Sequence, residues 1–291
     1  MAREATLPRR PLVATGATGD VRAGFWSGLT LAVISLVGLA AFLYPLFLTA
    51  APGSGTMSNP HSDDAPLIFG LVLALTLLLF VLELARQGMN AKTASALATL
   101  MMIAAALRIP TLPAGASAFF FAVILGGYVF GPRFGFLLGA GSLFVSTFAI
   151  GGFGPWLPFQ MFCAGWVGMT AGWLGVLRGW LSSHRLLELA CLAAFGLAWG
   201  FLFGAVMNLW FWPFMAVGEG VSWHPGQSLG EMLRHYWAFY LLTSAGWDAW
   251  RALANVILVA AMGRPVLDVL LRFRDRFQIE LRPLSFPADT D

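Results

Sequence analysis

The chain has 291 residues, of which 58% are hydrophobic and 11% are charged, with 12 tryptophans and 25 phenylalanines. This apolar share lies well above the roughly 45–50% of soluble domains, so the composition excludes an ordinary soluble protein and indicates an integral membrane protein. The 17 basic residues are scattered between hydrophobic runs and the net charge is only +3, which argues against a nucleic-acid-binding surface.

Apolar runs long enough for a bilayer recur along the sequence. A hydrocarbon core of about 30 Å needs about 20 apolar residues per helix, or fewer where a helix is buried among others. Gly131 and Pro132 divide one long run in two, because proline removes a backbone donor and glycine permits the turn. The sequence therefore predicts an all-α integral membrane protein with about eight transmembrane helices, at residues 25–48, 67–86, 92–109, 117–131, 133–150, 156–177, 186–210 and 237–262.

The positions of lysine and arginine predict the orientation of these spans. If the N-terminus is cytoplasmic, most of the basic residues fall on the cytoplasmic side, as the positive-inside rule requires. The connection 49–66 contains no basic residue and is expected outside. We therefore expect a multi-pass membrane protein with both termini in the cytoplasm.

The stretch GWDAWRALAN, at 246–255, places both signs of charge inside the last predicted span. On a helix Asp248, Arg251 and Asn255 share one face, which Trp247 flanks. Charges that face lipid cost several kcal/mol, so these residues are expected to face the bundle interior or a wet cavity. The spacing alone leaves two interpretations open, an ion pair that fixes the helix or a ligand pocket open to the outside.

Polar and aromatic residues at the outer ends of two other spans favour a pocket. The connection GGFGPWLPFQ, at 151–160, ends on Gln160. The stretch MNLWFWPF, at 207–214, has Asn208 as its second residue. An outer pocket with aromatic walls and a few convergent polar groups suits a small molecule, although tryptophans at a membrane boundary are usually interfacial anchors. The candidate substrate-binding residues are Trp156, Gln160, Asn208, Trp212, Trp247, Asp248, Arg251 and Asn255.

Between these elements the segment 211–236 is expected to cover the pocket. Ser228 and Glu231 have the spacing of a capping box, which predicts a short helix that begins there.

Sequence motifs for catalysis and ATP binding are absent. The chain has no G-x-x-x-x-G-K-[ST] phosphate loop, no H-E-x-x-H zinc motif and no G-x-S-x-G elbow, and its four histidines are scattered. We therefore expect no catalytic residues, no metal and no cofactor, and any uphill transport must draw energy from an ion gradient or another subunit. A gradient-driven secondary transporter for a small organic solute, an intramembrane enzyme and a structural membrane subunit remain as alternatives.

Small residues at a spacing of four mark close helix contacts in lipid. One pair, Ala94 and Ala98, lies at the cytoplasmic end of the third span. The others are Gly127, Gly131, Gly135, Gly139, Gly168 and Gly172.

Three stretches carry a resemblance to a known family: AKTASALATL, GGYVFGPRFGFLLGAGSLFVS and GFGPWLPFQMFCAGWVGMTAGWL. From about Lys92 to Arg264 the chain resembles the substrate-binding (S) component of an energy-coupling factor (ECF) transporter. The resemblance implies a six-helix substrate-binding core (89–264). Two additional helices with an outer loop (25–88) depart from the minimal pattern of the family, and the chain is expected to have a cytoplasmic tail at each end (1–24 and 265–291).

The resemblance also implies partners and a mechanism. Such a component captures a scarce vitamin from outside and associates with a transmembrane coupling subunit and two ATP-hydrolysing subunits. In the family an alanine pair on the first core helix contacts the coupling subunit, and Ala94 and Ala98 match that pair by position. The S component then topples in the membrane to release its ligand inside. A cobalamin-type corrinoid is the first guess for the ligand, while thiamine, its pyrimidine precursor and riboflavin remain open.

Overall fold

The computed structural model describes residues 17–47, 65–85, 91–110, 117–215 and 217–277, and all regular structure in these ranges is helical. The all-α class is thereby confirmed. The long helices are α1 (Ala17–Leu43), α2 (Ala65–Ala85), α3 (Ala91–Leu107), α4 (Phe119–Phe130), α5 (Pro132–Ile150), α6 (Leu157–Leu174), α8 (Arg185–Phe211), α9 (Leu229–Thr243) and α10 (Ala245–Phe277). Short elements are η1 (Tyr44–Phe47), η3 (Gly175–Leu177), α7 (Arg178–Leu181) and η4 (Trp212–Phe214).

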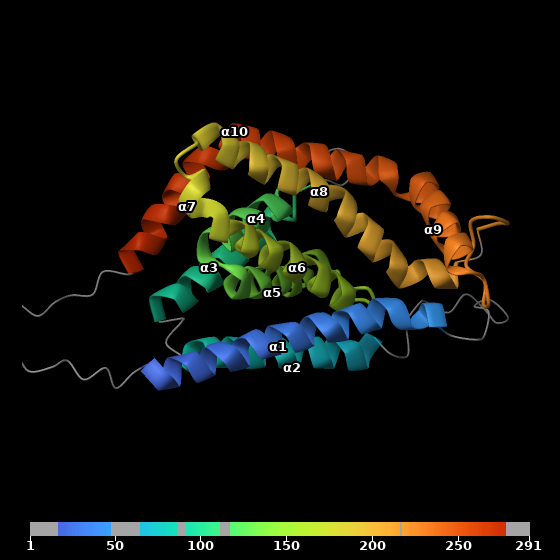
Figure 1. The fold of residues 1–291 in the computed structure, drawn as a ribbon, viewed down its shortest axis with the longest axis horizontal. Helices are drawn as coiled ribbons and strands as arrows, with labels where there is room; N and C mark the ends of the chain where they lie inside the picture. Colours follow the sequence, from blue (N-terminus) through green and yellow to red (C-terminus); the bar gives the residue numbers. More distant parts are fainter. Residues whose placement is uncertain (1–16, 48–64, 86–90, 111–116, 216, 278–291) are drawn as a thin grey trace, which may run out of the picture.

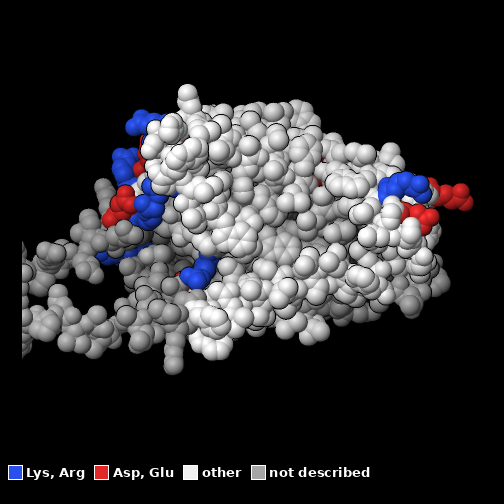
Figure 2. Space-filling model, viewed as in Figure 1, with Lys and Arg blue, Asp and Glu red and all other residues white. Residues whose placement is uncertain are grey.

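Several of these helices have the length and apolarity of membrane spans. Five segments qualify, namely Phe25–Phe47, Ala65–Ala85, Pro132–Ile150, Arg185–Phe214 and Ala245–Asp275, while α3 and α4 are apolar but shorter. On the face shown in Figure 2, charged side chains gather toward the two ends of the long axis and an uncharged stretch lies between them. This distribution suits a bundle whose long axis crosses the bilayer.

The helices form three layers (Figure 1). α4, α5 and α6 lie in the middle, α1 and α2 cover one side, and α8 and α10 cover the other. Nearly every residue of α4 is buried, as are most residues of α6, so these two helices are surrounded by protein. A helix in this position needs no full bilayer-spanning length, which is why α4 is short.

The turn predicted at Gly131 and Pro132 is confirmed. Gly131 has a φ of 95°, a left-handed value that favours glycine, and Pro132 begins α5 at a position that needs no backbone donor. Gly135 on α5 and Gly168 on α6 lie backbone against backbone, with no room for a Cβ atom on either. Close helix packing is thereby confirmed for Gly127, Gly135, Gly139, Gly168 and Gly172, whereas a Cβ atom on Gly131 would meet nothing within 4 Å.

The bounds predicted for the last span, 237–262, are wrong. The structure divides it between α9, which ends at Thr243, and α10, which begins at Ala245. Ser244 interrupts the helix with a φ of −127°. At the other end Pro265 lies inside α10 and does not end it, because Leu267 and Leu270 beyond it pack into the core.

The two N-terminal helices are attached to the middle layer by packing and by polar contacts. The indole nitrogen of Trp166 on α6 donates a hydrogen bond to the hydroxyl of Ser35 on α1, at 3.2 Å. On α2 the buried Glu83 pairs with Arg133 at the start of α5, with 3.3 Å between Oε1 and Nε. α6 carries a candidate site residue near its N-terminus, so these contacts also help to fix the site.

Candidate functional site

The site is built on a groove along α8 that receives one face of α10. Gly196, Gly200 and Gly204 recur every four residues on α8, and each lies directly beneath a residue of α10. A Cβ atom on Gly200 would lie 2.6 Å from the Cβ of Ala252, and one on Gly204 would collide with the carboxylate of Asp248. The glycines therefore allow the polar face of α10 to approach the α8 backbone.

Asp248 and Arg251 form an ion pair inside this groove. Nη1 of Arg251 donates to Oδ1 of Asp248 and to the carbonyl oxygen of Gly200, at 3.2 Å from the latter. The guanidinium carbon lies 5.2 Å from the ring centre of Phe203 and 5.9 Å from that of Phe120, within the range of cation–π attraction. The side chain of Asp248 is only 2% exposed. The charges thus face the bundle interior, as predicted.

Asn255 lies further along the same face of α10 and holds α10 to α8. Its Nδ2 donates to the carbonyl oxygen of Gly196 at 2.9 Å, and the residue is buried. Together with the hydrogen bond from Arg251 to the carbonyl oxygen of Gly200, this makes two hydrogen bonds from side chains of α10 to the backbone of α8. The common face predicted for Asp248, Arg251 and Asn255 is confirmed as a packing face.

A cavity of about 230 Å³ opens beside the ion pair. α6, α8, α10 and the break between α9 and α10 contribute its walls. The lining residues are Gln160, Phe203, Gly204, Met207, Asn208, Ser244, Trp247, Asp248 and Arg251. Five of the eight residues predicted from the sequence therefore surround one cavity, although they come from three helices.

Ser244 and Asn208 close one side of this cavity by exchanging hydrogen bonds. Nδ2 of Asn208 donates to the Ser244 hydroxyl at 2.8 Å, and that hydroxyl lies 3.0 Å from Oδ1 of Asn208, to which it can donate. This pairing links the end of α8 to the break before α10. The serine was not predicted as a site residue, because the sequence pattern placed it inside a continuous helix.

Arg108 is a second residue that the sequence did not single out. It follows α3 and donates from Nη2 to Oε1 of Gln160 at 3.1 Å and from Nη1 to the hydroxyl of Ser146 at 2.7 Å. These contacts join the ends of α3, α5 and α6. Its position between an apolar run and a proline-containing segment gave no signal of such a role.

The remaining predicted residues do not line the cavity. Trp212 is buried against Trp223, Tyr236 and Phe239, and its indole nitrogen donates to a backbone oxygen of the segment that follows. Trp156 packs edge-on against Trp210, with ring centres 6.4 Å apart, and Asn255 lies deeper between α8 and α10. The capping box at Ser228 is confirmed at the start of α9.

The described ranges contain no group of three His, Cys, Asp or Glu side chains that could hold a metal ion.

A family model described as ECF transporter, substrate-specific component, matches residues 68–263, more than half of the chain. The chain belongs to this family. Comparison with curated proteins and with solved structures found no match. The family supplies the substrate-specific component of a transporter and works with transmembrane and ATPase subunits.

The match to the ECF substrate-specific components contains every residue that lines the cavity beside the ion pair of Asp248 and Arg251. It begins inside α2, so it includes most of the second of the two helices that the sequence analysis placed outside the core. α1 precedes it entirely. The division into two additional helices and a six-helix core therefore stays a prediction.

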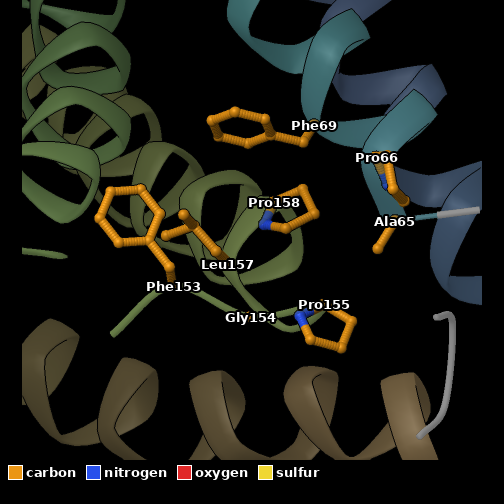
Figure 3. A pocket seen from close by; sticks show the side chains of 8 residues that line it. All are labelled: Ala65, Pro66, Phe69, Phe153, Gly154, Pro155, Leu157 and Pro158. Atoms are coloured by element: carbon orange, nitrogen blue, oxygen red, sulfur yellow. The ribbon is translucent and has the colours of Figure 1, made fainter. Parts of the chain in front are cut away.

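A second cavity, of about 300 Å³, lies between the start of α2 and the connection from α5 to α6 (Figure 3). Phe69 lines it from α2 and Phe153 from the connection, and its other lining residues are Ala65, Pro66, Gly154, Pro155, Leu157 and Pro158. It offers no polar side chain to orient a solute. Among these two cavities, the one beside Asp248 is therefore the better candidate for substrate binding in an ECF component.

Proposed function

We propose that this ECF component captures a vitamin or vitamin precursor on the outer side of a bacterial plasma membrane, in the cavity beside Asp248 and Arg251. The ligand would enter the cell when the component associates with a coupling subunit and two ATP-hydrolysing subunits. The observation that carries the proposal is the gathering of Gln160, Trp247, Asp248 and Arg251 around one cavity within the family match.

The outward orientation of this cavity rests on the distribution of basic residues. The cavity lies where α8 ends and α10 begins, opposite the end that carries Arg178, Arg264 and Arg272. Basic residues favour the cytoplasmic side of a bilayer, so the cavity end is expected outside. Both termini are then expected in the cytoplasm.

The volume of the cavity favours a compact ligand. About 230 Å³ lies just below the roughly 300–1,000 Å³ that small-molecule sites occupy. A single-ring vitamin suits this space, with its ring against Trp247 or Phe203. A corrinoid, the first guess from the sequence, is far larger and would require the surrounding helix ends to separate, so smaller ligands are the better-supported proposal.

The docking of the coupling subunit is proposed on α3. Ala98 is exposed there, while Ala94 is half-buried against the core, and Ser95, Thr99 and Met102 share the exposed face. Small side chains on an exposed membrane helix permit close approach of another helix. Ala98→Leu is expected to abolish co-purification with the coupling subunit, whereas Ala94→Leu would act mainly through the fold of this component.

Ligand binding is best tested by tryptophan fluorescence of the purified protein in detergent. Trp247 lines the cavity and is 60% exposed, so an occupied cavity should quench its emission. Titration with vitamins and their precursors is expected to give saturable quenching by one compound, and Asp248→Asn and Arg251→Gln should change its affinity. If one compound binds and neither variant alters the titration, this cavity is not the binding site.

Uptake in cells separates the proposal from a gradient-driven transporter. Accumulation is expected only when the coupling subunit and active ATPase subunits are present together with this chain. Accumulation by this chain alone that collapses with an ionophore would instead establish secondary transport.

A further inference from the structure

Arg108 is a partly buried cation without an acidic partner among the described residues. Its two hydrogen bonds go to the neutral side chains of Ser146 and Gln160. By contrast, Arg251 has Asp248, and Arg264 has Glu188 and Asp268. A charge that is withdrawn from water and not neutralised is costly, so its retention beside the cavity calls for a reason.

The contact with Arg108 determines which way the amide of Gln160 points. A guanidinium group has five donors and no acceptor, so the amide oxygen of Gln160 must face it. The Nε2 group of the same amide is thereby left to donate elsewhere, and Gln160 lines the cavity. Arg108 therefore turns Gln160 into a hydrogen-bond donor for whatever occupies that space.

Arg251 also has donors left over. Its Nη1 serves both Asp248 and the carbonyl oxygen of Gly200, whereas Nε and Nη2 have no acceptor among the described residues. The side chain is 23% exposed and lines the cavity. The other amide in the lining, on Asn208, is engaged with Ser244. Surplus donors thus come from Gln160 and Arg251.

The charges point in the same direction. Asp248 compensates Arg251, which leaves the charge of Arg108 uncancelled one hydrogen bond away from the cavity lining. Electrostatic attraction is stronger in a partly dehydrated site than in water, so the cavity favours an anion.

One oxygen of the Asp248 carboxylate is enclosed in the groove of α8. Oδ2 of Asp248 is buried and has no hydrogen-bond partner within the described part of the chain. Tyr240 is close enough to interact with Asp248, but its hydroxyl lies 3.4 Å from the carbonyl oxygen of Phe201, which accepts from it. Oδ2 lies against Gly204 and has almost no accessible surface, so a ligand in the cavity meets the donors of Gln160 and Arg251 and not this acceptor.

We propose that the ligand is a small organic carboxylate, and that Arg108 is the positioning residue that selects it through Gln160. The carboxylate accepts from the amide of Gln160 and from the free edge of Arg251. This inference rests on the proposed function, because it assigns the chemistry of the same cavity.

Matched pairs of compounds test the choice of ligand. The probes are pantothenate with panthenol and biotin with biotinamide, in which only the carboxylate is replaced by a neutral group. Quenching of tryptophan fluorescence gives an affinity for each member. The wild-type protein is expected to bind the carboxylate of at least one pair about tenfold or more tightly than its neutral analogue, as a charge-assisted hydrogen bond warrants.

Variants then test the role of Arg108. Arg108→Met is expected to remove the discrimination within that pair, and Arg108→Lys to retain part of it. Gln160→Glu should pair with Arg108, preserve the fold and reverse the preference. The control is Ser142→Ala, one turn from Ser146 on α5, whose hydroxyl bonds only to its own helix. The ratio of affinities is the readout, because a merely structural defect would weaken both members alike.

The outcomes separate this inference from the proposed function. Equal binding of both members in every pair that binds overturns the anion preference and leaves the substrate-binding function intact. Retained discrimination in Arg108→Met, with the control unchanged, overturns the role of Arg108. Absence of binding by every compound of the pairs and of the vitamin panel would overturn the binding function at this cavity and the inference with it.

Discussion

Gly200→Ala tests whether the groove formed by Gly196, Gly200 and Gly204 on α8 is needed to position the charged face of α10. The added Cβ would lie 2.6 Å from both the Cβ and the backbone nitrogen of Ala252. Carbon atoms pack at about 3.5–4.0 Å, so α8 and α10 must separate locally by about 1 Å. No flexible side chain is available to absorb this shift, because the opposing atoms are backbone and a Cβ.

The expected cost follows from overpacking in a tight core, about 1–3 kcal/mol. Alanine also favours a helix over glycine by about 1 kcal/mol, which partly hides this cost. Gly70→Ala on α2 measures that gain alone, since Gly70 faces open space. Gly200→Ala is therefore expected to be less stable than Gly70→Ala by about 1–3 kcal/mol, which at about 2–4 °C per kcal/mol separates their Tm values by several degrees.

Thermal unfolding in detergent, followed by size-exclusion chromatography of heated samples, gives the two Tm values. The same separation of helices would lengthen the bond from Arg251 to the carbonyl oxygen of Gly200, 3.2 Å in the structure, and so weaken ligand binding. Equal Tm values for Gly200→Ala and Gly70→Ala would refute the close approach of α8 and α10.

Three further predictions concern charged groups. Arg251→Gln leaves Asp248 buried and unpaired, so it is expected to lower the free energy of unfolding by about 3–5 kcal/mol, more than Asp248→Asn does. A melting experiment in which Asp248→Asn is the less stable variant would contradict the ion pair. Glu83→Gln weakens the charge-assisted contact with Arg133 and should lower stability by about 1–3 kcal/mol, whereas an unchanged Tm would argue that α2 is held by apolar packing alone. Hydrogen bonds from the N-cap serine lower the pKa of Glu231, so its stabilisation of α9 is present above the ordinary value of 4.5 and is lost as the pH falls through the lowered pKa. The protection of amides in the first turn of α9, measured against their intrinsic exchange rates, should therefore fall as the pH drops below about 4.5 in the wild type, with no such step in Glu231→Gln.

Much of the fold could be predicted because membrane helices are marked by long apolar runs in the local sequence. Long apolar runs predicted seven of the described helices with bounds within a few residues, apart from the earlier start of α1 at Ala17, and the turn at Gly131 followed from the conformational properties of two adjacent residues. The shared face of Asp248, Arg251 and Asn255 also followed from helix spacing alone. Each of these features depends on residues close together in the sequence.

The failures have a common physical cause, which is dependence on distant partners. The bond between Arg108 and Gln160 joins positions 52 residues apart, and nothing near either residue specifies it. The break at Ser244 is accompanied by a bond to Asn208, 36 residues earlier, while the surrounding sequence is apolar enough for a continuous helix. The predicted end at residue 262 was too early, since α10 continues through Pro265 to Phe277 and the packing of the following turns outweighs one lost backbone bond.

The two interpretations of GWDAWRALAN, a structural ion pair and a ligand pocket, turn out not to be alternatives. One nitrogen of Arg251 holds Asp248 and the α8 backbone, and the rest of the guanidinium borders the cavity. A planar group with five donors can serve both purposes at once, whereas a lysine presents three donors from a single nitrogen and reaches the two sides less well. Arg251→Lys should therefore retain much of the stability that Arg251→Gln loses and still bind a carboxylate ligand weakly, and a lysine variant with full affinity would show that the free edge of the guanidinium is not used.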